Sequence, residues 1–489
     1  MFKHHQGTCN HSNCPTDLDR RRFLATAGAA GAATVLQLDV LDFTSSLFAE
    51  EPKREGPLVS VGFALRPSGA GMTWPSGDTE MLEQIRAQYD KLLLDAANEL
   101  GVRLDILPEP LNDDGSNYLE RVEKTSPDGQ IILALNLNWE ARVSAALKNR
   151  GKIPTVVYSN LATHNIRWMK DTAELPGVYL GATPDLAWLK YALRMHKTLW
   201  RTKRMSILEK LPHEGYEHEF EKTGESDEMR AVFDFYTKNA EKIVEPPTES
   251  ILKSARHYMT IRRLIREGGY DGVTVAGASD LCLNGGWGCL ALSRLLDEGF
   301  VAACEGDRGC AHCQFLTLSL FDLPGFMGNP TPDTVNNFAI HSHCTSATKL
   351  EGLHQDYRAP FVLRDLHNTG SGVAMMVEWP IGRRATLMDM REDARFEIGS
   401  GVVTRNTKDV PQPPCGGCRT SVAFALDNVD DALKAALGHH KWCVLADIVR
   451  PFLAYAKLAG LEVSDLVGNK LAMSSRFGHP DWGDGVVIV

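Results

Sequence analysis

The sequence predicts a mixed α/β protein, in which two α/β domains with Rossmann-like parallel sheets precede a C-terminal β-rich domain that resembles an antiparallel barrel. Two observations lead to this fold class. In the first part of the chain, short apolar runs alternate with amphipathic helical stretches, and strands that alternate with helices form parallel sheets covered on both faces. After about Asn329, short Val, Ala and Met runs are separated by Gly, Pro and Asp, a spacing typical of antiparallel strands.

The same patterns define the individual elements. For the first α/β unit we expect strands and helices over 58–64, 80–100, 102–107, 130–135, 139–148 and 155–159. For the second unit we expect them over 178–180, 187–200, 205–208, 250–267, 272–276, 300–304 and 311–320. The charged interval 212–245 is either a helical excursion or a subunit contact. In the last domain we expect strands over 372–380 and a closing helix over 448–458.

These assignments divide the chain into four parts. A leader and linker over 1–50 precede an N-terminal α/β domain over 51–170, a second α/β domain over 171–330 and a β-rich domain over 331–489. The leader contains Arg20 and Arg21, then Phe23 and Leu24, then a weakly hydrophobic Ala/Gly stretch. This order resembles a bacterial twin-arginine export signal with cleavage near Ala49, which predicts a periplasmic or secreted protein. A short Ala-rich surface helix is the alternative.

The composition limits the classes of function. Of the 489 residues, 43% are apolar and 23% charged, which is enough for several domains with their own cores. The formal net charge of −10 argues against nucleic-acid binding, which needs a basic face. In the mature chain, no apolar run reaches the roughly 20 residues that a membrane-spanning helix needs.

Most of the chemistry lies in one short stretch. Glu305 follows the apolar strand 300–304, and open α/β sheets bind their ligands at the carboxyl ends of strands. A carboxylate at the end of a buried strand requires a partner or a metal. Asp307 is placed to cap the helix that follows. We therefore expect an acid–base or metal site at Glu305.

Four histidines further along the chain are candidate ligands. His341 and His343 lie on the same side of an extended segment, and His439 and His440 are adjacent near the end of the chain. A glutamate combined with distant histidines and further oxygen ligands suits Mn²⁺, Mg²⁺ or another divalent ion.

The motifs from about Asp271 to the C-terminus, taken together, resemble the L-fucose isomerase and L-arabinose isomerase superfamily. The segments that carry this resemblance are 288–293, 297–300, 303–307, 324–330, 341–344, 417–420 and 438–440. The resemblance implies two α/β domains followed by a β-rich domain, a homo-oligomer, and Mn²⁺ as the metal. It also implies interconversion of an aldose and a ketose, in which a metal holds two neighbouring sugar oxygens and two acid–base groups move a proton through an enediol.

The resemblance also assigns roles to individual residues. Glu305 matches the first acid–base group and metal ligand, and His343, or as a second choice His341, matches a histidine ligand. His439 or His440 matches the C-terminal ligand.

The second carboxylate of the family pattern is missing from its expected place. Asn329 stands where the fucose-type pattern has an aspartate; its amide can contact a metal or a sugar but cannot exchange a proton at useful pH. Four residues further on, Asp333 is the alternative second base. Arg419 either holds a sugar hydroxyl or carboxylate, or pairs with an acidic side chain.

Two Cys-x-x-Cys pairs leave a further alternative open. Cys310 with Cys313, and Cys415 with Cys418, can serve a redox or structural-metal role, or can be small core residues. Three functions therefore follow from the sequence. The first is an exported aldose–ketose isomerase that uses a divalent metal and Glu305. The second is a non-catalytic periplasmic carbohydrate-binding or sensing protein on the same scaffold, and the third is a thiol-redox protein.

Overall fold

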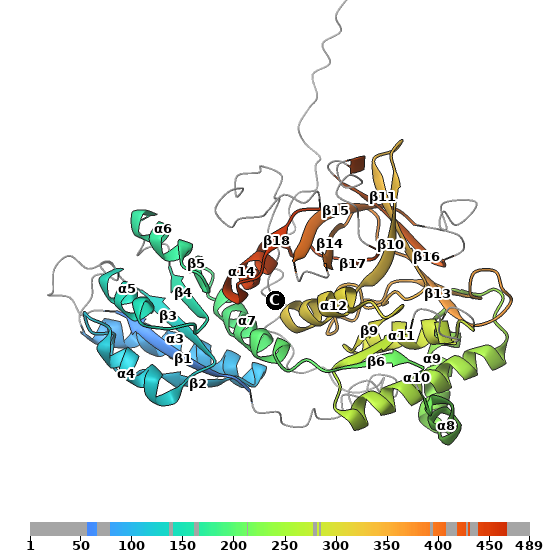
Figure 1. Ribbon diagram of the computed structural model, residues 1–489, viewed down its shortest axis with the longest axis horizontal. Coiled ribbons are helices and arrows are strands. Elements are labelled where there is room, and N and C mark those ends of the chain that lie inside the picture. Colours follow the sequence, from blue (N-terminus) through green and yellow to red (C-terminus); the bar gives the residue numbers. More distant parts are fainter. Residues whose placement is uncertain are drawn as a thin grey trace, which may run out of the picture. The chain divides into compact units, whose positions relative to one another are not determined.

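The computed structural model describes residues 56–65, 79–135, 140–160, 166–212, 214–276, 281–282, 285–391, 395–406, 418–426, 429–430 and 439–466. These residues form a mixed α/β structure that contains parallel sheets and a closed antiparallel barrel of six strands (Figure 1). The sheets confirm the predicted mixed α/β class, with parallel sheets and an antiparallel barrel. The predicted export signal lies outside the described residues.

The first sheet contains five parallel strands in the order β2-β1-β3-β4-β5. Their bounds are β2 (Arg103–Ile106), β1 (Leu58–Ala64), β3 (Gly129–Ala134), β4 (Thr155–Ser159) and β5 (Val178–Ala182). The helices around this sheet are α3 (Thr79–Leu100), α4 (Ser116–Thr125), α5 (Glu140–Lys148) and α6 (Ile166–Glu174). Along β3, Ile131 and Leu133 belong to one apolar cluster, whereas Ile132 and Ala134 belong to another. Because side chains alternate across a strand, both faces of the sheet are covered.

One strand belongs to a different sheet from the one we predicted. We expected the strand at Val178 to open the second α/β unit, but β5 pairs in parallel with β4 along its whole length. The reason is that a parallel strand can join either neighbouring unit, since the local apolar pattern is the same in both cases.

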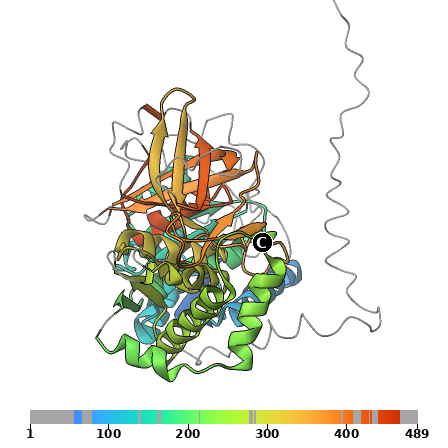
Figure 2. The same cartoon turned by 90° about the vertical axis from the view of Figure 1, so that its right-hand side faces the viewer.

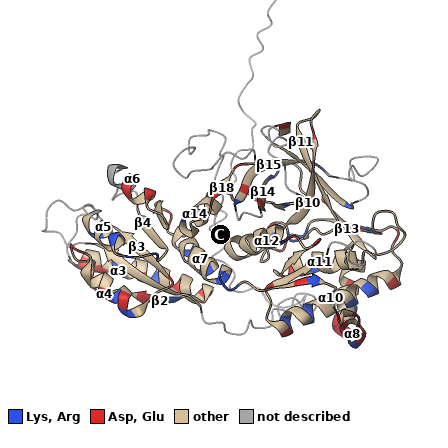
Figure 3. Ribbon diagram, in the orientation of Figure 1, with Lys and Arg blue, Asp and Glu red and all other residues tan. Residues whose placement is uncertain are grey.

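The second parallel sheet contains β6 (Ile207–Leu211), β8 (Gly272–Val275) and β9 (Val301–Ala303) in that order. Its helices are α10 (Thr248–Gly268), α11 (Trp287–Asp297) and α12 (Arg308–Phe321), whereas α7 (Trp188–Thr202) packs against the first sheet, where His196 contacts the Gln130 carbonyl of β3. The charged interval contains α8 (Tyr216–Lys222), α9 (Asp227–Asn239) and β7 (Lys242–Ile243), so most of its described residues are helical. Figure 3 shows charges of both signs along α8 and α10.

The barrel closes through six antiparallel strands in the order β14-β17-β10-β11-β16-β15, with β15 pairing back to β14. Their bounds are β14 (Arg384–Met390), β17 (Lys441–Val444), β10 (Phe326–Asp333), β11 (Phe338–His343), β16 (Thr420–Ala425) and β15 (Phe396–Asn406). A short strand, β18 (Val463–Ser464), adds to β15. Figure 2 shows these strands side by side. The predicted strand region 372–380 instead forms β13 (Ala374–Val377), which pairs with β12 (Phe361–Arg364) and lies in a separate sheet with β7.

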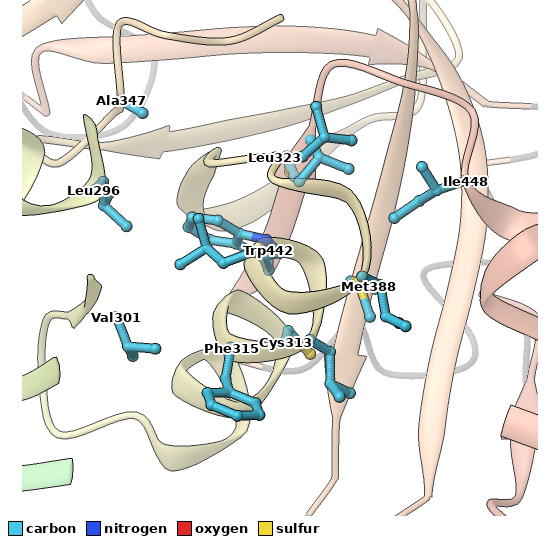
Figure 4. Close-up of a cluster of buried hydrophobic side chains, with 14 of the residues drawn as sticks. Leu296, Val301, Cys313, Phe315, Leu323, Ala347, Met388, Trp442 and Ile448 are labelled. Atoms are coloured by element: carbon cyan, nitrogen blue, oxygen red, sulfur yellow. The ribbon is translucent and has the colours of Figure 1, made fainter. Parts of the chain in front are cut away.

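Helix α12 connects the second parallel sheet to the barrel. It contacts β9 on one side and the barrel strands β14 and β17 on the other. Cys313 and Phe315 of α12 lie in an apolar cluster with Met388 and Trp442 of the barrel (Figure 4). The indole nitrogen of Trp442 also donates a 2.9 Å hydrogen bond to the hydroxyl of Thr317 on α12. This packing fixes the loop before α12 relative to the barrel.

The final helix is α14 (Val449–Ala459), which confirms the closing helix that the sequence predicts. Pro451 lies in its first turn, where a missing backbone N–H costs no hydrogen bond. No helix among the described residues is long and apolar enough to span a membrane.

Candidate metal and acid–base site

Glu305 lies in the turn between β9 and α12, as the sequence predicts. Its backbone is left-handed, with φ of 56°, and Gly306 follows with φ of 66°. Left-handed backbone is uncommon for a residue with a side chain, and such positions are concentrated at functional sites. The amide of Gly306 donates a 2.6 Å hydrogen bond to the carbonyl of Val275, at the end of the neighbouring strand β8. The turn is therefore held by the sheet, which fixes the start of the Glu305 side chain.

Three histidines surround the Glu305 carboxylate. His343 Nε2 lies 3.5 Å from Oε1, while His440 Nε2 and His439 Nε2 lie 3.4 Å and 3.2 Å from Oε2. His343 ends β11 and His440 precedes β17, so the barrel places both rings against the turn from the α/β sheet. The ligand atoms of Glu305, His343 and His440 all lie within 4.8 Å of one another. We call these three residues the Glu305 centre.

The other ring nitrogen of each buried histidine has a partner. His343 Nδ1 lies 3.0 Å from the Thr345 hydroxyl, and His440 Nδ1 lies 2.8 Å from a carboxylate oxygen of Asp307. Metal-binding histidines usually carry such a partner, because it fixes the ring and leaves the opposite nitrogen directed at the ion. His440 Nε2 is buried and has no hydrogen-bond partner of good geometry in the described part of the chain. The donor set of one carboxylate and two imidazoles therefore fits a divalent metal.

Asp307 has two functions in this structure. Its side chain accepts a 2.8 Å hydrogen bond from the backbone N–H of Cys310, which confirms the predicted helix cap. The second oxygen of the same carboxylate holds His440, which the sequence analysis did not foresee.

The ionisation of these groups follows from their contacts. The close approach of His343 and His440 holds the pKa of Glu305 well below its usual range, against the opposing effect of burial. Burial lowers the pKa of His343, and Glu305 offsets only part of this effect. Burial also opposes a charge on His440, but its hydrogen bond to Asp307 and its contact with Glu305 raise its pKa to about 9. At neutral pH the metal-free centre thus contains an ionised Glu305, a neutral His343 and a protonated His440.

This protonation state predicts that metal binding is pH-dependent. A metal needs the neutral imidazole of His440, so below a pKa of about 9 each ion displaces one proton. Mn²⁺ affinity should rise about tenfold per pH unit up to pH near 9 and level off above it, because one displaced proton is a factor of ten per unit. Titration of Mn²⁺ by isothermal calorimetry at several pH values, in buffers of different ionisation enthalpy, measures the proton release directly. An affinity that is flat between pH 7 and pH 9 would contradict the assignment of His440 as a ligand.

Replacing Asp307 tests the partner of His440 separately. Asp307→Asn keeps a good helix cap, so we expect little change in the melting temperature. The variant loses the negative charge beside His440, and Mn²⁺ affinity measured near pH 9, where the proton on His440 competes only weakly with the metal, should fall by about 10- to 100-fold, as for other partners of metal-binding histidines. Calorimetric titration of the variant measures this loss, and an unchanged affinity would show that Asp307 serves only as the cap.

The other predicted residues lie at varying distances from the Glu305 centre. Asn329 on β10 is close to it, since its amide donates a 3.3 Å hydrogen bond to the backbone carbonyl of His439. Asp333 lies four residues further along the strand, about 13 Å away at the rise of a β-strand. There its exposed carboxylate accepts hydrogen bonds from Val335 N, Asn336 N and the Asn336 amide, within the hairpin turn. The structure therefore does not bring Asp333 to Glu305.

His341 and Arg419 also have partners away from the centre. His341 is buried in the barrel, where Nδ1 lies 3.5 Å from the Cys443 sulfur and the ring packs edge-on against Phe424. The Arg419 side chain is buried and pairs with the carboxylate of Asp365, also buried. The sequence left two roles open for Arg419, a contact with a sugar or an ion pair with an acidic side chain. Its contacts among the described residues are those of the ion pair.

The predicted Cys-x-x-Cys pairs are only partly described. Cys310 and Cys313 are fully buried free thiols on α12, and burial raises the pKa of both. A reactive thiol needs the opposite shift, so these two residues are best interpreted as core residues. Cys415 lies outside the described residues.

Directly after His440 lies a group of buried charges that the sequence analysis missed. The Lys441 side chain is fully buried, with its ammonium 2.8 Å from Glu397 on β15 and 3.3 Å from Asp389 on β14, the strand next to its own. Arg391 lies 2.6 Å from the other Glu397 oxygen. The sequence signal was a lysine within a short apolar strand, but its partners lie far away along the chain.

Comparison with known proteins adds no family to this description. No protein-family profile matches the sequence, and no curated protein matches it. The fold and the site define the chain as a mixed α/β protein with an antiparallel barrel, whose junction carries a glutamate–histidine–histidine group suited to a divalent metal.

Proposed function

We propose that this chain is an exported aldose–ketose isomerase-like protein that uses a divalent metal, Mn²⁺ first, at the Glu305 centre. The observation that carries this proposal is the convergence of Glu305, His343 and His440 from the sheet edge and two barrel strands within 4.8 Å. The resemblance of the motifs to the fucose and arabinose isomerases supplies the reaction class. Two Rossmann-like domains, a homo-oligomer, a sugar substrate and twin-arginine export are part of the same proposal.

The residues of the centre suit proton transfer between neighbouring carbons. Glu305, His343 and His440 would hold the metal, which would supply Lewis-acid polarisation of the sugar oxygens. Glu305 is ionised at neutral pH, so its carboxylate accepts the proton from C2 while the C1 carbonyl oxygen gains a proton, which gives the enediol. Glu305 then returns the proton to C1 as the C2 hydroxyl loses its proton, and the ketose results.

The proton gained by the C1 oxygen and the proton lost from the C2 hydroxyl need a second acid–base group. The His439 side chain is 73% exposed and its Nε2 lies 3.2 Å from Glu305, so a substrate can reach both groups. We therefore assign this role to His439 in place of Asp333, whose carboxylate is engaged in the hairpin turn.

One observation favours a second function. The amide of Asn329 stands beside the centre where a second carboxylate is expected from the resemblance, and an amide cannot exchange a proton at useful pH. A carbohydrate-binding or sensing protein that retains the metal but has lost turnover is the alternative.

Hydrogen exchange separates the two functions. The chain with Mn²⁺ bound is incubated with a panel of aldoses in D₂O, and NMR follows deuterium entry at C2 together with ketose formation. Exchange with an aldose supports the isomerase. Sugar binding without exchange supports the alternative, and Asn329→Asp should then increase exchange if the missing carboxylate is the cause. If the metal-loaded chain shows no exchange and binds no sugar, both functions are contradicted.

A further inference from the structure

A second group of ligand-type side chains lies apart from the Glu305 centre. Sγ of Cys344, Sγ of Cys418 and a ring nitrogen of His367 all lie within 4.8 Å of one another. They come from three segments: Cys344 follows β11, His367 follows β12, and Cys418 precedes β16. Three distant segments therefore bring two sulfurs and one imidazole nitrogen to one point, and all the sulfurs are free thiols.

The spacing of one pair of these atoms matches a tetrahedral metal site. His367 Nε2 lies 3.4 Å from Cys418 Sγ. In a tetrahedral zinc site with Zn–S near 2.3 Å and Zn–N near 2.0–2.1 Å, a sulfur and a nitrogen ligand are about 3.6 Å apart. The His367 nitrogen and the Cys418 sulfur are thus at about the distance expected for two ligands of one metal ion.

A further thiol, that of Cys289 on α11, lies beside Cys344. Cys289 interacts with Cys344, and Cys344 with Cys418, but Cys289 is not one of the three residues whose ligand atoms all lie within 4.8 Å of one another. Cys289 is fully buried, whereas Cys418 and His367 are half-buried. The group therefore has a closed inner side and a partly open outer side through which an ion can enter.

The loop that carries His367 is held in place by other contacts. His367 and Asn368 both have left-handed backbone, with φ of 49° and 61°. Arg419, next to Cys418, donates hydrogen bonds to the Asp365 carbonyl at 2.7 Å and to the Asn368 amide oxygen at 2.9 Å. Strained backbone persists only where the surroundings enforce it, and here they direct the His367 ring at the two thiols.

We propose that Cys344, His367 and Cys418 bind one thiophilic divalent ion, Zn²⁺ first, with water as the fourth ligand on the partly open side. Sulfur-rich donors select zinc, whereas the carboxylate and imidazoles of the Glu305 centre suit Mn²⁺, so the two sites are chemically distinct. Binding converts the two thiols to thiolates and releases two protons to solvent. Because Cys344 directly follows His343, an ion here also fixes the end of the strand that carries a ligand of the Glu305 centre.

Cobalt substitution tests this site directly. The full chain, purified under reducing conditions and freed of metal, is titrated with Co²⁺, whose thiolate complexes give a strong near-ultraviolet charge-transfer band. We expect the band to appear, to saturate at one ion per chain and to disappear when Zn²⁺ is added. Cys418→Ser and His367→Gln should each weaken or remove it, and both positions are half-buried, which favours folding of the variants.

Two matched variants complete the test. Cys313→Ala removes a buried thiol outside the group, and Glu305→Gln changes the other centre; the band should survive both. A folded wild-type chain that takes up cobalt without a thiolate band, or a band that is unaffected by Cys418→Ser, would overturn the proposal. A disulfide between Cys344 and Cys418 that still forms with Zn²⁺ in excess, found by peptide mapping, would also overturn it.

Discussion

Glu305→Gln should reduce isomerisation and C2 hydrogen exchange by about 10²- to 10⁴-fold, the usual contribution of a positioned acid–base group. The substitution preserves size but removes the charge that accepts the proton. It also removes a negative ligand between His343 and His440, so Mn²⁺ affinity should fall as well. Rates are therefore measured by NMR at Mn²⁺ concentrations that saturate the variant, so that the loss in chemistry is separated from the loss in binding.

A comparison variant makes this result specific. Glu174→Gln changes an exposed carboxylate on α6 and should leave both exchange and metal affinity unchanged. His439→Asn should slow exchange while Mn²⁺ binding persists, because His439 is assigned to proton transfer and not to the metal. If Glu305→Gln exchanges deuterium at the wild-type rate with metal bound, proton transfer occurs elsewhere and the proposed function loses its central residue.

Much of this site could be predicted from the sequence because its signals are local. A carboxylate at the end of an apolar strand and an aspartate before a helix are readable from a few neighbouring residues, and the structure has both. The short apolar runs also located β1, β3 and β4 within a residue or two. Such features depend only on residues within one helix or strand and in the turn beside it.

The features that were missed depend on contacts between distant segments. The pairing of Asp307 with His440 joins residues 133 positions apart, and that of Cys418 with His367 joins residues 51 positions apart. The same limitation explains β5, whose apolar pattern suits either sheet. It also explains Asp333: hairpin geometry, which spacing alone does not reveal, directs its carboxylate into the turn.

Lys441→Met should destabilise the barrel by about 3–5 kcal/mol, the usual cost of breaking a buried ion group from one side. The Lys441 ammonium is enclosed between Asp389 and Glu397, and the variant leaves two buried carboxylates without their shared cation. Burial already raises the pKa of Asp389 in the presence of the lysine. Without it, Asp389 should take up a proton at higher pH, so the variant should lose less stability at low pH than at neutral pH. Urea unfolding at two pH values measures both effects.

The expected loss comes mainly from the two buried carboxylates that lose their shared lysine, of which Glu397 keeps its ion pair with Arg391, rather than from the missing ion pair itself. Lys441→Met combined with Asp389→Asn and Glu397→Gln should therefore recover a large part of the stability, since no buried charge is left without a partner. Lys238→Met, at a pair on α9 where the lysine is 71% exposed, should cost at most about 1 kcal/mol. A Lys441→Met variant as stable as the wild type would mean that water reaches the three charged groups, in which case the barrel strand beside His440 is not the rigid support that the Glu305 centre requires.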